Sequence, residues 1–176
     1  MSSTEARPQK DSAATPESPK EAAPQKEHLW LQRMVGEWTF EVEASMTPGE
    51  PSVKLPGTET VRSLGGLWTL AEGVGETPEG APAKSLMTLG YDPQKKRFVG
   101  TFVASMMTHM WVYDGALDAG ANKLTLDTEG PGAGKTASFQ DIIEFKSKDE
   151  RTMTSQMRND DGTWTQVMTA TYRRKK

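Results

Sequence analysis

The sequence predicts an all-β fold: a single antiparallel up-and-down β-barrel of about ten strands, entered by a short helix and preceded by a disordered tail. Three observations support this prediction. The first 26 residues contain no Val, Ile, Leu, Phe, Tyr or Trp. A short segment with helical periodicity follows. From Glu37 to Arg173, short runs of alternating apolar and polar residues are separated by turn signals.

Residues 1–26 have the composition of an unfolded segment. Four of them are proline, and four basic residues balance four acidic ones. Such a segment buries too little apolar surface to offset the ~1–2 kcal/mol per residue that backbone ordering costs. We therefore expect a disordered tail at 1–26 and one folded domain at 27–176.

The segment 29–35 has helical spacing. Trp30 and Met34 lie four residues apart, as do Leu31 and Val35, so each pair shares one helical face. Gly36 follows, and glycine at this place is typical of a helix end. We expect a helix of two turns.

The clearest alternation in the chain runs from Glu37 to Met46. Its apolar members are Trp38, Phe40, Val42, Ala44 and Met46. One apolar and one polar face are typical of a half-buried antiparallel strand. Nine further strand-like runs follow, at 57–64, 67–76, 85–91, 96–105, 109–117, 123–128, 137–146, 151–158 and 164–173.

Proline and glycine mark the connections between these runs. Pro56-Gly57 is expected to break the chain, and Asp92-Pro93 suits a type I turn. Asp160-Asp161-Gly162 predicts a tight hairpin. Gly65-Gly66 fits either a hairpin or a β-bulge.

Ten short strands without a long helical pattern indicate a barrel or a sandwich. A closed barrel has no exposed edge strand, whereas a sandwich has four. A single short helix before the first strand would cap one open end of a barrel. These arguments favour the barrel.

Composition excludes several classes of function. The net charge is −3, and the basic run Arg173–Lys176 is a chain end, so we expect no nucleic-acid binding. The absence of cysteine excludes disulfides and thiolate metal sites. We find neither ~18 consecutive apolar residues nor an apolar secretion signal, and therefore expect a cytoplasmic protein without a membrane span.

Two motifs invite a stronger interpretation. Gly130–Thr136 is similar to a phosphate-binding loop, but Glu129 stands where that motif needs glycine, and a strand follows instead of a helix. Met106–Met110 gathers soft donors that suit Cu(I). Alternation along a strand would separate these donors, and methionine more often fills gaps in a core. We expect neither a nucleotide nor a metal site.

No residue is predicted to be catalytic. Ser105 lacks the flanking glycines of a nucleophile elbow. The acidic residues are explained by positions on the solvent-facing sides of strands. They include Glu72, Asp92, Asp114, Asp127, Glu129 and Asp141.

Two aromatic patterns point to the barrel interior. His109, Trp111 and Tyr113 alternate and would share one strand face. A histidine there would either hydrogen-bond locally, which we favour, or ligate haem iron. Gly36-Glu37-Trp38 would place an indole on the barrel floor, with its N–H seeking a partner.

These patterns resemble the lipocalin and calycin barrels, and more specifically the bacterial DUF1579 family, over residues 27–175. The segments that carry the resemblance are His28–Leu31, Gly36–Trp38, Leu89–Pro93, Phe98–Gly100, Ser105–Gly115, Leu117-Asp118, Asp161–Trp164 and Tyr172–Arg174. The resemblance implies a calycin-like barrel. It implies no catalytic residue, because the family has no assigned function.

The first functional hypothesis is a barrel that binds a small apolar or amphipathic molecule in its interior. The predicted pocket residues are Trp38 at the base and Ser105, Met107, His109, Trp111 and Tyr113 along the wall. A second hypothesis is a haem protein similar to the nitrobindin barrels, with His109 as the axial ligand. A third is a self-associating barrel, a homo-oligomer with a filled interior.

Overall fold

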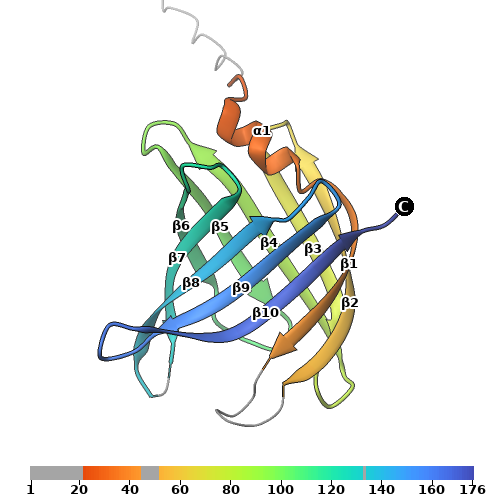
Figure 1. Ribbon diagram of the computed structural model, residues 1–176, viewed down its shortest axis with the longest axis vertical. Coiled ribbons are helices and arrows are strands. Elements are labelled where there is room, and N and C mark those ends of the chain that lie inside the picture. Colours follow the sequence, from red (N-terminus) through yellow and green to blue (C-terminus); the bar gives the residue numbers. More distant parts are fainter. Residues whose placement is uncertain (1–21, 45–51, 133) are drawn as a thin grey trace, which may run out of the picture.

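The structure, a computed structural model, describes residues 22–44, 52–132 and 134–176. Within these residues one helix precedes ten strands: α1 (Lys26–Gln32), β1 (Gly36–Ala44), β2 (Val53–Leu64), β3 (Trp68–Glu76), β4 (Pro82–Asp92), β5 (Arg97–Ala104), β6 (Trp111–Leu117), β7 (Lys123–Pro131), β8 (Thr136–Phe145), β9 (Glu150–Arg158) and β10 (Trp164–Arg174). Each strand pairs antiparallel with its sequence neighbour, and β10 pairs with β1 to close the barrel (Figure 1). The predicted fold class is confirmed.

The strand boundaries agree with the sequence prediction to within a few residues, with one instructive exception. The expected break at Pro56-Gly57 is wrong, because β2 runs through it from Val53. Pairing with β3 begins only at Gly57, so Pro56 pairs with β1 alone and removes no bond from the β3 ladder. Packing favours glycine at position 57, since a Cβ there would clash with the Phe40 ring and would lie 2.7 Å from the Val74 carbonyl oxygen.

Parts of two predictions lie outside the described residues. These are residues 1–21 of the expected tail and Ser45-Met46 at the end of the first expected strand.

The predicted turns form hairpins. Gly65 and Gly66 both have positive φ, 63° and 72°, and lie in the loop between Leu64 and Trp68, which decides for a hairpin over a bulge. Gly162, with φ 85°, turns β9 into β10 as expected. Asp92 Oδ1 accepts backbone N–H bonds from Gln94 and Lys95, which fixes the β4–β5 turn.

The helix α1 closes one end of the barrel (Figure 1). It ends at Gln32, slightly earlier than expected, and a turn leads into β1. Trp30, Leu31 and Met34 are all buried, so the predicted apolar face points into the barrel. The indole N–H of Trp30 donates to the Ala121 carbonyl at 2.8 Å, which ties the helix to the β6–β7 loop.

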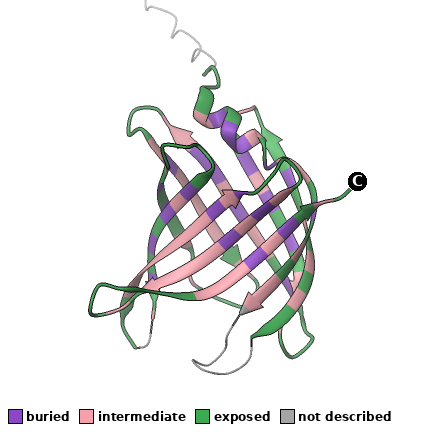
Figure 2. Ribbon diagram, in the orientation of Figure 1, coloured by how far each residue is buried: buried purple, intermediate pink, exposed green. Residues whose placement is uncertain are grey.

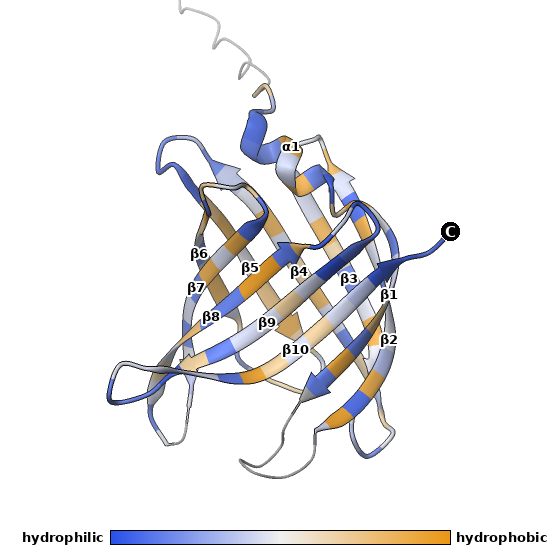
Figure 3. Ribbon diagram, viewed as in Figure 1, coloured by the Kyte–Doolittle hydropathy of each residue, from blue (hydrophilic) through white to orange (hydrophobic). Residues whose placement is uncertain are grey.

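Buried residues alternate with less buried ones along several of the strands (Figure 2). On β7, for example, Leu124, Leu126 and Thr128 are buried, whereas Lys123 and Asp127 between or beside them are exposed. The hydropathy colouring follows the same alternation along the wall (Figure 3). In the part of the chain that the structure describes, no helix is long and apolar enough to cross a membrane.

Candidate functional site

A cavity of about 220 Å³ lies inside the barrel at the end opposite α1. Side chains of β1–β5, β9 and β10 form its wall, together with the segment that follows β5. The larger apolar residues of this lining are Phe40, Val42, Leu55, Met87, Phe102, Met153 and Met168. A concave, mainly apolar site with a few polar groups is the usual form of a small-molecule site.

The cavity is open because the inner face of β3 and β4 carries small side chains. Ala71, Gly73 and Gly75 occupy three successive inward positions on β3, and Ala83 and Ser85 continue the pattern on β4. In an alternating wall, side-chain size alone decides whether the enclosed space is filled. These strands leave it unfilled.

An ion pair between Arg151 of β9 and Glu59 of β2 forms the polar floor of the cavity. The side chain of Arg151 is 1% exposed and that of Glu59 is 11% exposed. The Arg151 guanidinium also lies over two aromatic rings, with its Cζ 3.9 Å from the ring centre of Tyr172 and 4.9 Å from that of Trp38. Desolvated contacts of this kind contribute about 2 kcal/mol, so the guanidinium is held in place from several sides.

The hydrogen bonding of this ion pair is incomplete. Arg151 Nη2 donates to Glu59 Oε2, but the buried Arg151 Nε has no hydrogen-bond partner among the described residues. Burial raises the pKa of Glu59 by more than the Arg151 guanidinium lowers it. A buried donor without a partner is unfavourable, so this ion pair carries a cost in stability that its hydrogen bonding does not offset.

A second polar pair lies deeper in the interior. Tyr113 of β6 donates its hydroxyl hydrogen to Asp141 Oδ2 of β8 at 2.5 Å. Burial raises the pKa of Asp141, and hydrogen bonds from Tyr113 and Ser155 oppose that rise. Burial first, and then the neighbouring Asp141 carboxylate, raises the pKa of Tyr113. Neither residue of the pair lines the cavity.

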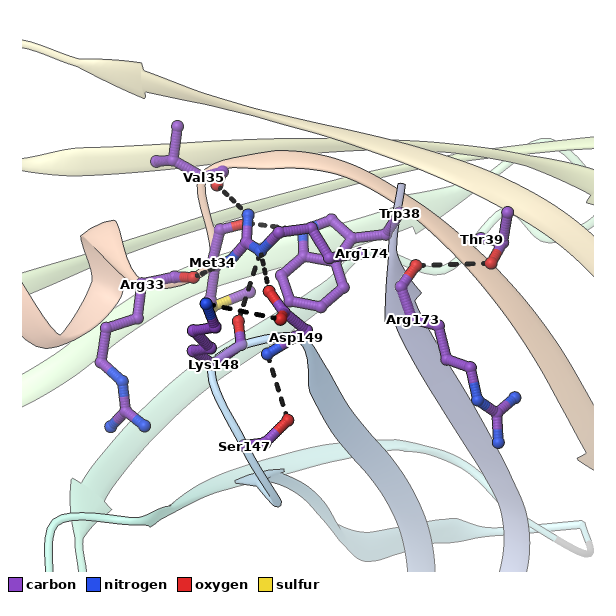
Figure 4. A network of polar contacts seen from close by, with 10 residues as sticks. All are labelled: Arg33, Met34, Val35, Trp38, Thr39, Ser147, Lys148, Asp149, Arg173 and Arg174. Atoms are coloured by element: carbon purple, nitrogen blue, oxygen red, sulfur yellow. Dashed lines mark hydrogen bonds and ion pairs between the residues drawn. The ribbon is translucent and has the colours of Figure 1, made fainter. Parts of the chain in front are cut away.

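At the α1 end of the barrel, Arg174 of β10 binds the segment that connects α1 to β1 (Figure 4). Its Nη1 and Nη2 donate to the carbonyls of Val35 and Arg33, at 2.8 and 2.9 Å, where α1 turns into β1. Its guanidinium also lies over the Trp38 ring at 4.1 Å and pairs with Asp149 at 3.5 Å. Access to the cavity is therefore from the open end.

Of the six residues predicted to line a pocket, Met107 lines the cavity and Trp38 lies beneath its floor. Met107 belongs to the segment between β5 and β6. Trp38 is fully buried, contacts Arg151, and donates its indole N–H to the Met34 carbonyl at 2.8 Å. The Met34 carbonyl is thus the hydrogen-bond partner that the sequence analysis expected for the Trp38 indole.

The other four residues lie elsewhere. Trp111 packs edge-to-face against Phe139, and Tyr113 bonds to Asp141; both are on β6, a strand that contributes no residue to the cavity lining. Ser105 is exposed, and its hydroxyl accepts the Lys84 backbone N–H at 3.0 Å. None of these three is in the cavity lining.

His109 also lies outside the cavity. It precedes β6, which starts at Trp111, so it does not share a strand face with Trp111 and Tyr113 as expected. Its Nε2 is 3.1 Å from the Glu129 carbonyl, and its ring packs edge-to-face on Trp111. It lines a separate shallow depression beside Val112 and Trp164.

The structure corrects one of the predicted solvated carboxylates. Asp141 faces the interior, because its position on β8 is in phase with the inward-facing Ile143 and Phe145. Asp114 and Asp127, by contrast, are exposed and lie near Arg97. Among the described residues no group of three or more His, Cys, Asp or Glu is arranged to hold a metal ion.

Sequence reasoning missed Glu59 and Arg151, the polar floor of the cavity. A usable signal was present, because both charges stand in phase with inward apolar residues of their strands. Glu59 is two residues before Val61, and Arg151 is two residues before Met153. A charge on the apolar face of a half-buried strand predicts a buried partner.

Comparisons with known proteins place the chain in a family and a fold. The family model described as "Protein of unknown function (DUF1579)" matches residues 23–174. No curated protein matches the sequence.

Two solved structures illustrate the similarity of fold. The S-type phycobiliprotein lyase CPES from Guillardia theta is 15% identical, with a TM-score of 0.55 over 87% of this chain and 99% of that one. Rv2717c from M. tuberculosis is 12% identical, with a TM-score of 0.56 over 86% of this chain and 99% of that one. At these identities the likeness is one of fold alone.

Proposed function

We propose that this chain, which belongs to the DUF1579 family of proteins of unknown function, binds a small apolar or amphipathic molecule in the cavity at the open end of its barrel. The observation that carries the proposal is the cavity itself: about 220 Å³ of mainly apolar space that ends on the Arg151–Glu59 ion pair. A cavity of about 150 Å³ in another protein already holds benzene. This one suits a single ring or a short chain.

The division of the barrel into two ends supports the same function. The α1 end is filled by buried aromatic residues and held by Arg174, whereas at the cavity end β3 and the start of β4 carry small inward residues. A binding site needs a rigid wall and an entrance. The packed α1 end makes the barrel wall rigid, and the opposite end provides the entrance.

The haem hypothesis depends on a residue that lies away from this site. His109 faces the Glu129 carbonyl and is separate from the cavity lining. Adding haem to the purified protein and comparing the Soret band with that of His109→Ala is the direct test. The self-association hypothesis predicts a homo-oligomer with no affinity for any small apolar compound.

The test of the cavity proposal is calorimetric titration with three eight-carbon compounds: octan-1-ol, octanoate and octylamine. At least one should bind the parent protein. Ala104→Trp places an indole in the lining and should weaken that binding at least tenfold. Val103→Trp is the matched control, because Val103 is the neighbouring outward-facing residue, 39% exposed, and should bind as the parent does.

Two outcomes would overturn the proposal. One is that none of the three compounds binds and native mass spectrometry finds no retained small molecule. The other is that Ala104→Trp and Val103→Trp bind equally well, because binding would then be outside the cavity.

A further inference from the structure

The cavity floor carries no net charge. Arg151 and Glu59 are one cation and one anion in direct contact, and both line the cavity. At the entrance the balance repeats, since the lining there contains Lys84 and Glu76. The remaining ionisable side chain of the lining is Tyr172, whose pKa is raised by burial and by the nearby Glu59, so that its hydroxyl stays neutral.

The same floor offers both a donor and an acceptor. Arg151 borders the cavity, and the N–H groups of its guanidinium donate hydrogen bonds. Glu59 is the more accessible member of the pair and presents a carboxylate, which accepts hydrogen bonds. A ligand group that both accepts and donates therefore finds a partner for each role at one place.

On the premise that the cavity is a binding site, we propose that its ligand is uncharged: a compact apolar body with one hydroxyl or amide head group, which Arg151 and Glu59 orient. The apolar wall of Phe40, Met87 and Met168 holds the body, and the head group meets the ion pair at the inner end. The site therefore selects ligands with an uncharged head group over ligands with a charged one.

Charged ligands are disfavoured by the groups that face the site. A carboxylate beside Arg151 would leave two anions, the ligand and Glu59, on one guanidinium. An ammonium group would have to displace Arg151 from Glu59 or lie beside its positive charge. Either arrangement leaves a buried charge uncompensated, which proteins avoid strongly.

The eight-carbon series distinguishes this inference from the proposed function. In the parent protein, octan-1-ol and octanamide should bind at least tenfold more tightly than octanoate and octylamine at pH 7. Equal or tighter binding of octanoate would overturn the inference while leaving cavity binding intact. Failure of all four compounds to bind, with no small molecule retained in native mass spectrometry, would instead remove the proposed function.

A variant provides a second, independent readout. Glu59→Gln removes the anion and leaves the buried guanidinium uncompensated, so octanoate becomes the complementary ligand. Its affinity should rise at least tenfold over the parent, and it should raise the melting temperature of the variant more than octan-1-ol does. The inference is overturned if octanoate affinity stays at the parent value in a variant whose circular dichroism shows a folded barrel.

Discussion

The two ends of the barrel are made by the same alternation of residues and yet have opposite interiors. At the α1 end the inward positions are large: Trp30, Trp38, Leu89, Phe98 and Phe145 are all buried and pack together. At the other end the inward positions of β3 and β4 are Gly, Ala and Ser. The period of two builds the wall of the barrel, and side-chain size on the inner face determines which end is solid.

The polar groups of the two ends differ in the same sense. Around α1, buried donors have partners: Trp38 donates to Met34, and Arg174 donates to Arg33 and Val35. At the cavity floor the Arg151 Nε has none among the described residues. Satisfied donors and dense packing stabilise a fold, whereas an unsatisfied buried donor costs stability. The α1 end thus stabilises the fold, and the other end of the barrel provides the candidate ligand site.

The largest effect on stability is expected when one tryptophan is removed from each end of the barrel and the two variants are compared. Trp38→Ala should lower the free energy of unfolding by about 3–5 kcal/mol, because a fully buried indole leaves a cavity in a packed core. It also removes the ring on which Arg151 and Arg174 lie. Trp164→Ala, at the cavity end, should cost about 1 kcal/mol or less, since Trp164 is 37% exposed on the start of β10.

Urea denaturation of both variants measures this difference. A loss for Trp164→Ala equal to that for Trp38→Ala would contradict the assignment of stability to the α1 end.

The fold could be predicted from sequence because its determinants are local. Alternation from Glu37 onward, the helical pair Trp30 and Met34, and glycine-marked turns each act over a few residues. The Trp38 bond was foreseeable for the same reason, since its acceptor Met34 is four residues away. Local patterns specify the strands, and the closure of β10 onto β1 follows once no edge is left exposed.

The cavity could not be predicted in the same way, because its floor joins residues far apart in the chain. Glu59 and Arg151 are 92 positions apart and meet only because the strand order and register place β2 and β9 across the interior. The predicted group around His109 rests on alternation along one expected strand, but β6 begins only at Trp111. Alternation within one strand carries no information on which other strands enclose the same space.

A second test concerns the ion pair. Arg151→Met should destabilise the protein by about 3 kcal/mol, because it leaves Glu59 without its counter-charge in the interior. The double variant Arg151→Met, Glu59→Leu should recover most of that loss, since an apolar pair of similar size needs no compensation. Thermal unfolding of the two variants and of Glu59→Leu completes the cycle.

Additive losses in that cycle would show that the two side chains act independently. The comparison of the two ends predicts strong coupling instead, together with loss of alcohol binding in the double variant, which keeps the fold but has an apolar floor.

The smallest expected effect is a dependence of stability on pH that arises from Asp141. Burial raises the pKa of Asp141 above 3.8, so in the pH range just above 3.8 the folded protein binds a proton that the unfolded chain has released. The unfolding free energy therefore falls as pH rises through this range, and the loss is complete above the raised folded-state pKa.

Asp141→Asn keeps a neutral side chain throughout. The stability of the variant relative to the parent should consequently increase as the pH rises from 3.8 through the raised pKa of Asp141. Glu129→Gln, at an exposed position on β7, is the matched control. Parallel curves for the parent and Asp141→Asn would contradict this prediction, because they would mean that Asp141 has the same pKa in the folded and the unfolded protein.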